Sequence, residues 1–207
     1  MTVLDSTVPY PWPYDGCLDP GRMALVVAGA QAGWAARSSR AADVATVLLT
    51  VAGELRSIGA LIVVVRHGAV PRGRGAAPGR TSFPPQPGED GWRLTFSPRP
   101  TDIVVDAAGI NGFHGGPLDD VLRAKGVDRL VLGGFGHEAA VDSTMRSAND
   151  RGYECLILSD GVAPFDEDLG AHALSSVTMS GGIFGAVGTS ADLLSALRQP
   201  TELEAVS

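Results

Sequence analysis

Continuous apolar runs, separated by segments with helical spacing, constrain the fold of this chain more than any other feature of its sequence. Such runs predict strands that are buried on both faces, because a strand with one face in water would alternate apolar and polar residues. The segments between them carry apolar residues at the i, i+3, i+4 spacing of amphipathic helices. The pattern predicts an α/β fold, a three-layer α/β/α sandwich around a mainly parallel, Rossmann-like sheet.

The expected elements follow one another in a regular strand–helix order. The buried runs that we interpret as strands are Met23–Ala30, Ala60–His67, Asp102–Ala107, Arg129–Phe135 and Glu154–Asp160, and a further apolar run covers Gly182–Val187. The segments with helical spacing are Ala41–Ser57, Pro117–Lys125, Glu138–Arg151, Asp168–Met179 and Ser190–Leu197. Gly126 and Gly152 stand directly after two of these helices, where a left-handed glycine commonly ends a helix.

We expect a single domain over residues 1–207 with two irregular parts. Residues 1–22, which include PYPWPYD, are expected to run over the surface as an extended N-terminal segment. Residues 68–101 are rich in Gly, Pro and Arg and are too long for an ordinary connection between elements. This long irregular loop is either a lid over a site, an arm onto a neighbouring subunit, or a solvated loop.

Composition narrows the classes of partner and the compartment. The formal net charge of -7 argues against nucleic acid or an anionic membrane as a partner, since both attract a basic face. No apolar run reaches the roughly 18 residues of a membrane-spanning helix, and Pro and acidic residues interrupt the opening segment where a signal peptide would be apolar. Cys17 and Cys155 make a poor disulfide framework. We therefore expect a soluble, cytoplasmic protein in which Cys155 packs in the core.

The ends of the expected strands point to a common surface. In open parallel sheets, ligands bind beyond the carboxyl ends of the strands, at the point where strand order reverses. This rule places four segments together: Ala28–Gln31, Arg66–His67, Asp106–Gly109 and Gly134–Ala140.

Three parts of the chain carry a family resemblance. They are ALVVAGAQ at Ala24–Gln31, DIVVDA at Asp102–Ala107, and the long run Asn111–Gly161, of which VDSTMRSANDRGYE is particularly close to the family pattern. In this order and spacing, the chain resembles the isochorismatase-like superfamily, also called the cysteine hydrolase superfamily. The resemblance implies the isochorismatase-like hydrolase fold.

The resemblance also implies a catalytic set. Members usually hydrolyse amides or related bonds with an Asp base, a Lys and a Cys nucleophile, although a few relatives that hydrolyse a vinyl ether keep the Asp without the Cys. At the matching positions this chain has Gly29, Ala107 and Ala140. Chemistry by an activated thiol needs the thiol, its base and a stabilising charge. We therefore expect no cysteine-dependent hydrolysis, and a larger, more apolar cavity at these three positions.

Other residues near the strand ends are candidates for chemistry or binding. His137 and Glu138 stand where an imidazole and a carboxylate can transfer protons; alternatively, Glu138 caps the helix and His137 fills space. Arg66 either holds a ligand carboxylate or forms a surface salt bridge. The expected ligand-binding residues are Gln31, Trp34, Arg66, His67, Trp92, Phe113 and Phe135, although each aromatic residue can also belong to the core.

We expect neither a metal nor a cofactor. His67, His137 and Asp106 converge on a metal only if several strand ends tilt inward. The glycine-rich GGFG and SGGIFG lack the spacing of a phosphate loop or a dinucleotide fingerprint. His114 is expected to support its loop, and His172 to be structural or exposed.

Functions from different classes remain open. The first is a pseudoenzyme that binds a small-molecule ligand or serves as a structural partner of an active paralogue. The second is a repurposed metabolic enzyme, a lyase, isomerase, cyclase or non-thiol hydrolase, that uses His137 and Glu138 for acid–base chemistry. Weak hydrolysis of the family type is a third. By analogy we expect a homo-oligomer, a dimer or a tetramer, or a hetero-oligomer with the active paralogue.

Overall fold

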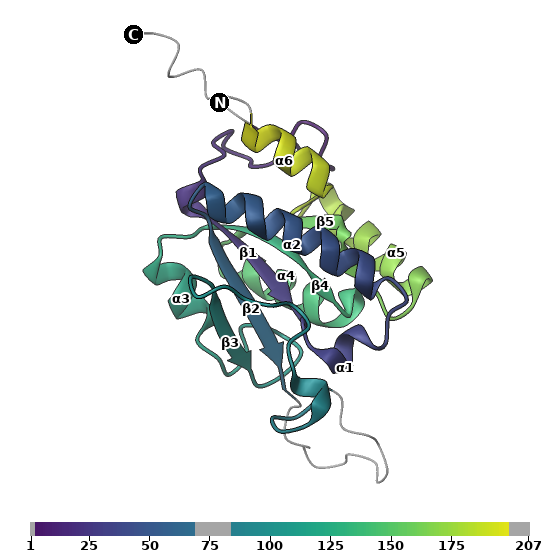
Figure 1. Cartoon of the computed structure of the whole chain (residues 1–207). Coiled ribbons are helices and arrows are strands. Elements are labelled where there is room, and N and C mark those ends of the chain that lie inside the picture. The colour runs from purple at the N-terminus through teal and green to yellow at the C-terminus, as the bar shows by residue number, and fades with distance from the viewer. Residues whose placement is uncertain (1–2, 69–83, 199–207) are drawn as a thin grey trace.

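A sheet of six parallel strands forms the centre of the molecule (Figure 1). The computed structural model describes residues 3–68 and 84–198. The strand order is β3-β2-β1-β4-β5-β6, so the order reverses between β1 and β4. The strands are β1 (Met23–Ala28), β2 (Leu61–His67), β3 (Ile103–Ala107), β4 (Arg129–Phe135), β5 (Glu154–Ala163) and β6 (Ala186–Gly188). The parallel sheet agrees with the mainly parallel sheet that the buried apolar runs predicted.

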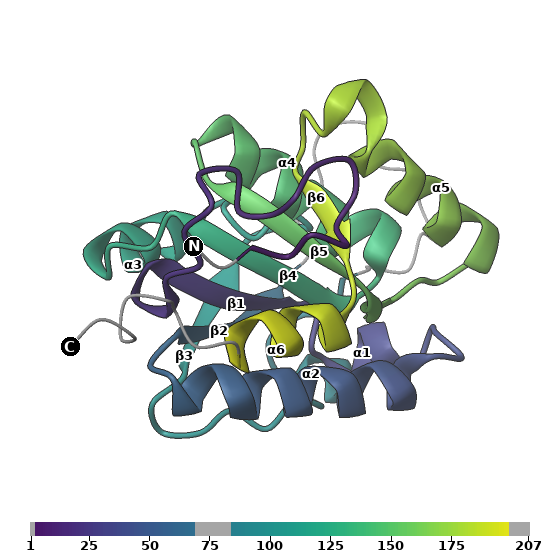
Figure 2. The same cartoon turned by 90° about the horizontal axis from the view of Figure 1, so that it is seen from above.

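Helices cover both faces of the sheet. The α-helices are α1 (Ala32–Ala35), α2 (Ala41–Ser57), α3 (Leu118–Ala124), α4 (Asp142–Asp150), α5 (Glu167–Val177) and α6 (Ser190–Arg198). Short 3-10 helices are η1 (Pro20–Arg22), η2 (Asp90–Trp92) and η4 (Met179–Gly181), and η3 (His137–Val141) is a π-helix. Figure 2 shows α2 and α6 on one face of the sheet and α4 and α5 on the other, which gives the three layers.

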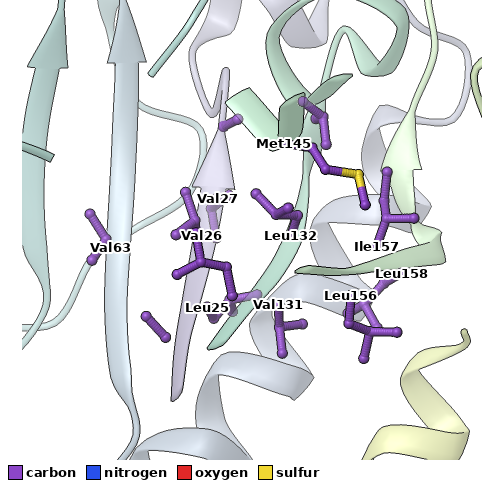
Figure 3. Packing of buried hydrophobic residues seen from close by; sticks show 14 of the residues in the cluster. Leu25, Val26, Val27, Val63, Val131, Leu132, Met145, Leu156, Ile157 and Leu158 are labelled. Atoms are coloured by element: carbon purple, nitrogen blue, oxygen red, sulfur yellow. The ribbon is translucent and has the colours of Figure 1, made fainter. Parts of the chain in front are cut away.

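The core follows from the composition of the strands. Every residue of β1 and of β4 is buried, because each of these two central strands has a paired neighbour on both sides and helices over both faces. Figure 3 shows side chains of the cluster on these strands and their neighbours, with the α4 methionine among them: Leu25, Val26, Val27, Val63, Val131, Leu132, Met145, Leu156, Ile157 and Leu158.

Most element boundaries agree with the sequence prediction, and the exceptions have local causes. The long helix begins and ends at the predicted residues, Ala41 and Ser57, and Gly126 and Gly152 have φ of 69° and 84°. The first strand ends at Ala28 rather than Ala30, because Gly29 turns the chain with φ of 65°. The predicted helix from Glu138 to Arg151 is divided into η3 and α4.

The N-terminal segment runs along the free side of β6. Val8 and Val187 exchange both backbone hydrogen bonds, at 3.0 and 2.8 Å, and form an antiparallel bridge. Trp12 is fully buried. The described part of residues 1–22 is therefore packed on the body and ends in the short helix η1. It is not extended throughout, because Leu4 and Trp12 form an antiparallel bridge that folds the segment back on itself.

The long loop divides into two parts. Its residues 69–83, on which the lid or arm would depend most, lie outside the described residues. The part from residue 84 packs on the segment around α1: the Thr95 N–H donates to the Ala30 carbonyl at 2.9 Å, and the Ala32 N–H donates to the Arg93 carbonyl at 2.8 Å. Phe96 is 1% exposed. This part of the loop is thus integral to the fold near the carboxyl end of the sheet.

Candidate functional site

The carboxyl end of the sheet brings together the segments that the sequence grouped. Ala28 is in register with Val65 on one side and with Gly134 on the other. His67 is in register with Ala107 at the ends of β2 and β3. The end of β1, next to the reversal of strand order, is where ligands bind in sheets of this kind.

Gln31 and His67 form one rigid unit at this end. The Gln31 Oε1 atom accepts the His67 backbone N–H at 2.7 Å, and its Nε2 donates to the His67 carbonyl at 3.4 Å. The His67 Nδ1 atom lies 3.0 Å from the Gly109 carbonyl oxygen, and because a carbonyl only accepts, Nδ1 carries the proton. Burial lowers the pKa of His67 to about 4, although this hydrogen bond opposes the shift. His67 is therefore neutral near pH 7.

Trp34 fills the centre of the expected cavity. The residue has no exposed surface, and its ring stacks on Phe165 with centroids 5.5 Å apart and lies 5.6 Å from the His67 ring. A Cβ atom on Gly136 would collide with the Trp34 ring. The prediction of a larger cavity is therefore wrong at this centre: the large indole occupies the space beside the small residues.

Gly29 and Ala140 both lie in closely packed surroundings. A Cβ atom on Gly29 would stand 2.5 Å from the Phe135 carbonyl oxygen and 3.4 Å from Trp34 Cδ2. Its φ of 65° is also one that side chains rarely accept. Ala140 is fully buried, and its carbonyl accepts the Thr144 hydroxyl at 2.6 Å. Of Gly29, Ala107 and Ala140, only Ala107 lines a pocket among those described below.

That pocket, which we call the Trp92 pocket, has a volume of about 250 Å³ and is lined by Gly68, Gln86, Pro87, Trp92, Asp106, Ala107, Ala108 and Gly115. Arg66 lies beside it: its guanidinium binds Asp106 through two hydrogen bonds of 2.6 and 2.9 Å and stands 5.1 Å from the centre of the Trp92 ring. The salt bridge that the sequence left open for Arg66 is thus formed, with Asp106 as its partner.

His137 and Glu138 face different neighbours. The Glu138 carboxylate accepts the backbone N–H of Phe165 at 2.9 Å and that of Asp166 at 3.2 Å. It therefore caps the start of the segment before α5, not its own helix. His137 is 1% exposed and lines a second pocket, the His137 pocket, of about 120 Å³. Its pKa falls to about 4, mainly through burial.

The remaining predicted residues lie elsewhere. Phe113 packs 5.8 Å from the Tyr153 ring and 4.8 Å from the Arg151 guanidinium, between α4 and the start of β5. Phe135 is 1% exposed and belongs to the core. The His114 side chain is exposed, and its carbonyl accepts the Ala108 N–H at 2.8 Å, as a loop-supporting residue would. His172 is exposed on α5.

The residue types of thiol catalysis lie away from this end of the sheet. Cys155 is the second residue of β5, is fully buried, and burial raises the pKa of its thiol far above the usual range. Cys17 is exposed in the N-terminal segment before β1. Lys125, the single lysine of the chain, follows α3 and precedes β4. All three come just before strands or at a strand's start, at the amino end of the sheet.

The family model described as Isochorismatase domain matches residues 23–192. The chain belongs to the isochorismatase family. The ureidoacrylate amidohydrolase RutB of Methylobacterium radiotolerans is 36% identical over 111 residues, which cover 53% of this chain and 42% of that enzyme. The corresponding protein of an Enterobacter species is 30% identical over 105 residues, 50% of this chain and 44% of its own length. These matches span less than half of each relative.

Solved structures of the isochorismatase family share the fold. A cysteine hydrolase from Pseudomonas syringae pv. phaseolicola superposes with a TM-score of 0.75 at 23% identity, over 87% of this chain and 94% of that one. An isochorismatase family protein from Burkholderia thailandensis gives a TM-score of 0.70 at 28% identity, over 86% and 97%. In the described part of this family member, no helix is long and apolar enough to cross a membrane, and no three His, Cys, Asp or Glu side chains cluster as a metal site requires.

Several residues of the site were not found from the sequence. Phe165, which stacks on Trp34, lies in the β5–α5 connection, and Arg40 and Glu167 pair across the rim of the His137 pocket at 3.8 Å. None of them carries a local signal, because their roles depend on contacts between elements that are distant in sequence. Gln86 lines the Trp92 pocket from the long irregular loop, of which the sequence singles out only Trp92 as a binding residue.

Proposed function

We propose that this isochorismatase-family chain does not hydrolyse substrates through a cysteine and instead binds a small molecule in the Trp92 pocket. The proposal takes Gly29, Ala107 and Ala140 as the positions of the family's Asp, Lys and Cys. It is supported by the location of both cysteines and of the single lysine at the opposite end of the sheet.

The conformation of Gly29 carries this proposal. A general base at this position needs a side chain, and any Cβ atom here would stand 2.5 Å from the Phe135 carbonyl oxygen. The left-handed φ of 65° adds strain for any residue except glycine. The backbone has therefore settled into a form that excludes the base, while Trp34 closes the space in front of it. In this proposal the backbone itself, and not only the missing carboxylate, rules out a base at Gly29.

The Trp92 pocket has the features of a binding site for a small, partly apolar ligand. Trp92, Pro87 and Ala107 supply apolar surface, and Asp106 and Gln86 supply polar groups. A few placed polar groups in an otherwise apolar hollow give a ligand its orientation. The Asp106 carboxylate already accepts from Arg66 through both oxygens, so its remaining lone pairs suit a hydrogen-bond donor on the ligand.

Acid–base chemistry by His137 with Glu138 has less support. The Glu138 carboxylate is held by the backbone N–H groups of Phe165 and Asp166, which leaves it poorly placed to orient an imidazole. His137 lines a pocket of its own, and this pocket shares no lining residue with the Trp92 pocket. Because the His137 pocket and the Trp92 pocket are separate, this arrangement favours ligand binding over a catalytic centre shared between them.

Two measurements test the proposal. Purified protein is assayed for hydrolysis of ureidoacrylate and nicotinamide, before and after thiol alkylation. Turnover at about 1 per second or faster that alkylation abolishes would overturn the proposal that the chain does not use a cysteine for hydrolysis. Small-molecule fragments are then screened by ligand-observed NMR. Fragments that bind the wild type are expected to lose affinity with Ala108→Leu, which narrows the Trp92 pocket.

A matched control keeps that screen specific. Val104 is exposed on β3, the strand that Ala108 follows, and lies outside the pocket, so Val104→Leu enlarges an exposed apolar side chain without blocking the pocket. Equal loss of binding in both variants, or no loss in Ala108→Leu, would contradict the assignment of the Trp92 pocket.

A further inference from the structure

The His137 pocket lies between η3 and α5, next to the layer that Figure 2 shows on the α4–α5 side of the sheet. Its apolar walls come from the end of β5 and from α5, and its volume is about 120 Å³: Val162, Pro164, Gly170, Ala171 and Leu174 line it. An apolar cavity of about 150 Å³ is large enough to hold benzene. This pocket therefore limits an occupant to about one small ring.

His137 is the uncharged polar side chain of this pocket, and one of its ring nitrogens has no partner in the described part of the protein. Its residue is 1% exposed, and its Nε2 atom has no hydrogen-bond partner among the described residues. A buried polar atom without a partner carries a desolvation penalty that a bound group can remove. Its Nδ1 atom lies 3.9 Å from where a Cβ on Gly170 would stand, so the absence of a side chain on α5 leaves room beside the ring.

The charged groups around the pocket favour an uncharged occupant. At the rim, Arg40 and Glu167 lie 3.8 Å apart and neutralise each other. Asp142, which follows η3, accepts from Arg146 at 2.9 Å. The imidazole itself is neutral near pH 7, because burial lowers its pKa to about 4, with Arg40 adding to this shift and Asp142 opposing it. An ion entering the pocket would lose its hydration without an unpaired counter-charge.

We propose that the His137 pocket is a second binding site, which takes an uncharged molecule of about one ring with a hydroxyl group, of the phenol type. The hydroxyl forms a hydrogen bond with the imidazole of His137, which lines the pocket. The ring packs against Val162, Pro164 and Leu174. Entry is over the rim formed by the Arg40–Glu167 pair and Ala171. This site is independent of the Trp92 pocket, so failure of one assignment leaves the other standing.

The test is a titration of the protein with phenol, followed by the ring ¹⁵N signals of its four histidines. We expect saturable shifts of the His137 nitrogens. Benzene, which lacks the hydroxyl, is expected to bind about ten-fold more weakly, as one hydrogen bond predicts. Shifts confined to other histidines, or tighter binding of benzoate than of phenol, would overturn the proposal.

Two variants make the outcome specific. Ala171 is exposed and lines the pocket, so Ala171→Leu blocks entry without disturbing the core. The affinity for phenol should then fall at least about ten-fold, because phenol loses most of its apolar contact with the pocket. Ser175→Leu, at an exposed position of α5 outside the pocket, should change the affinity for phenol less than about two-fold. Unchanged binding in Ala171→Leu, or equal losses in both variants, would contradict the site.

Discussion

The two ends of the sheet differ in what holds them together. At the amino end, Arg129 is almost wholly buried and forms ion pairs with Asp15, Asp128 and Glu154. At the carboxyl end, the centre is an indole packed on glycine backbone, with Gln31 and a neutral His67 beside it. Ion pairs therefore stabilise the amino end of the sheet, and close packing stabilises the carboxyl end.

Removing the Trp34 indole should weaken the packing of the carboxyl end, and we expect the largest effect on stability from this change. Trp34→Ala leaves a cavity between Phe165 and His67, and we expect the free energy of unfolding to fall by about 3–5 kcal/mol. Urea denaturation measures the change. Trp92→Ala, at the half-buried aromatic position of the neighbouring pocket, is the control and should cost clearly less. Equal losses would show that Trp34 does not anchor this end.

Acid should weaken the carboxyl end selectively. The pKa values of His67 and His137 are lowered by burial from 6.5 to about 4, so the unfolded chain binds more protons than the folded one between these pH values. Stability is therefore full above about pH 6.5 and falls as the pH drops towards 4, by about 3 kcal/mol for each histidine at about 1.36 kcal/mol per pKa unit.

Denaturation series from pH 7 to pH 4 check this dependence. His67→Asn retains a donor for the Gly109 carbonyl but does not titrate, and it should flatten the curve. The same slope in the His67 variant as in the wild type would contradict the assignment.

Introducing an acid at Gly29 should destabilise the protein instead of activating it. Gly29→Asp places a Cβ atom against the Phe135 carbonyl in a left-handed conformation, which we expect to cost about 2–4 kcal/mol. Gly29→Ala should cost a similar amount, because the backbone contact is the cause. Combined with Ala107→Lys and Ala140→Cys, the change should restore no hydrolysis; turnover in this triple variant would refute the structural reading of Gly29.

The smallest effect is expected at the rim. Arg66 and Asp106 are partly exposed, at 30% and 53% of their side chains, so their mutual interaction should contribute less than about 1 kcal/mol. A double-mutant cycle with Arg66→Met and Asp106→Asn measures it directly. A coupling energy well above that value would mean that charge also organises the carboxyl end.

The sequence predicted the scaffold well because its signals are local. The apolar run at Met23 and the spacing within Ala41–Ser57 depend on burial and helical period alone, and both elements formed there. The site was harder to predict. The sequence suggested an emptied cavity from three small residues, but Trp34 and Phe165 close it, and their stacking requires knowledge of how α1 and the β5–α5 connection meet.

The pair of His137 and Glu138 shows the same limit. Adjacent in sequence, they suggest joint acid–base chemistry, yet the π-helical turn η3 directs Glu138 to the backbone before α5 and His137 into its own pocket. Arg66 was left between two roles because its partner, Asp106, is fixed only by the register of β2 and β3. Side-chain direction and strand register are properties of the assembled fold.

The N-terminal segment has a consequence for how copies of this sheet can join. Because Val8 occupies both backbone groups of Val187, the β6 margin is already capped by the chain itself, whereas β3 is the other outermost strand of the described sheet. Growth of a continuous intermolecular sheet needs two open margins on each copy. Because the β6 edge is covered, two copies that pair through their β3 edges would form a sheet with no free edge left. Such pairing would give a dimer and not an open-ended polymer.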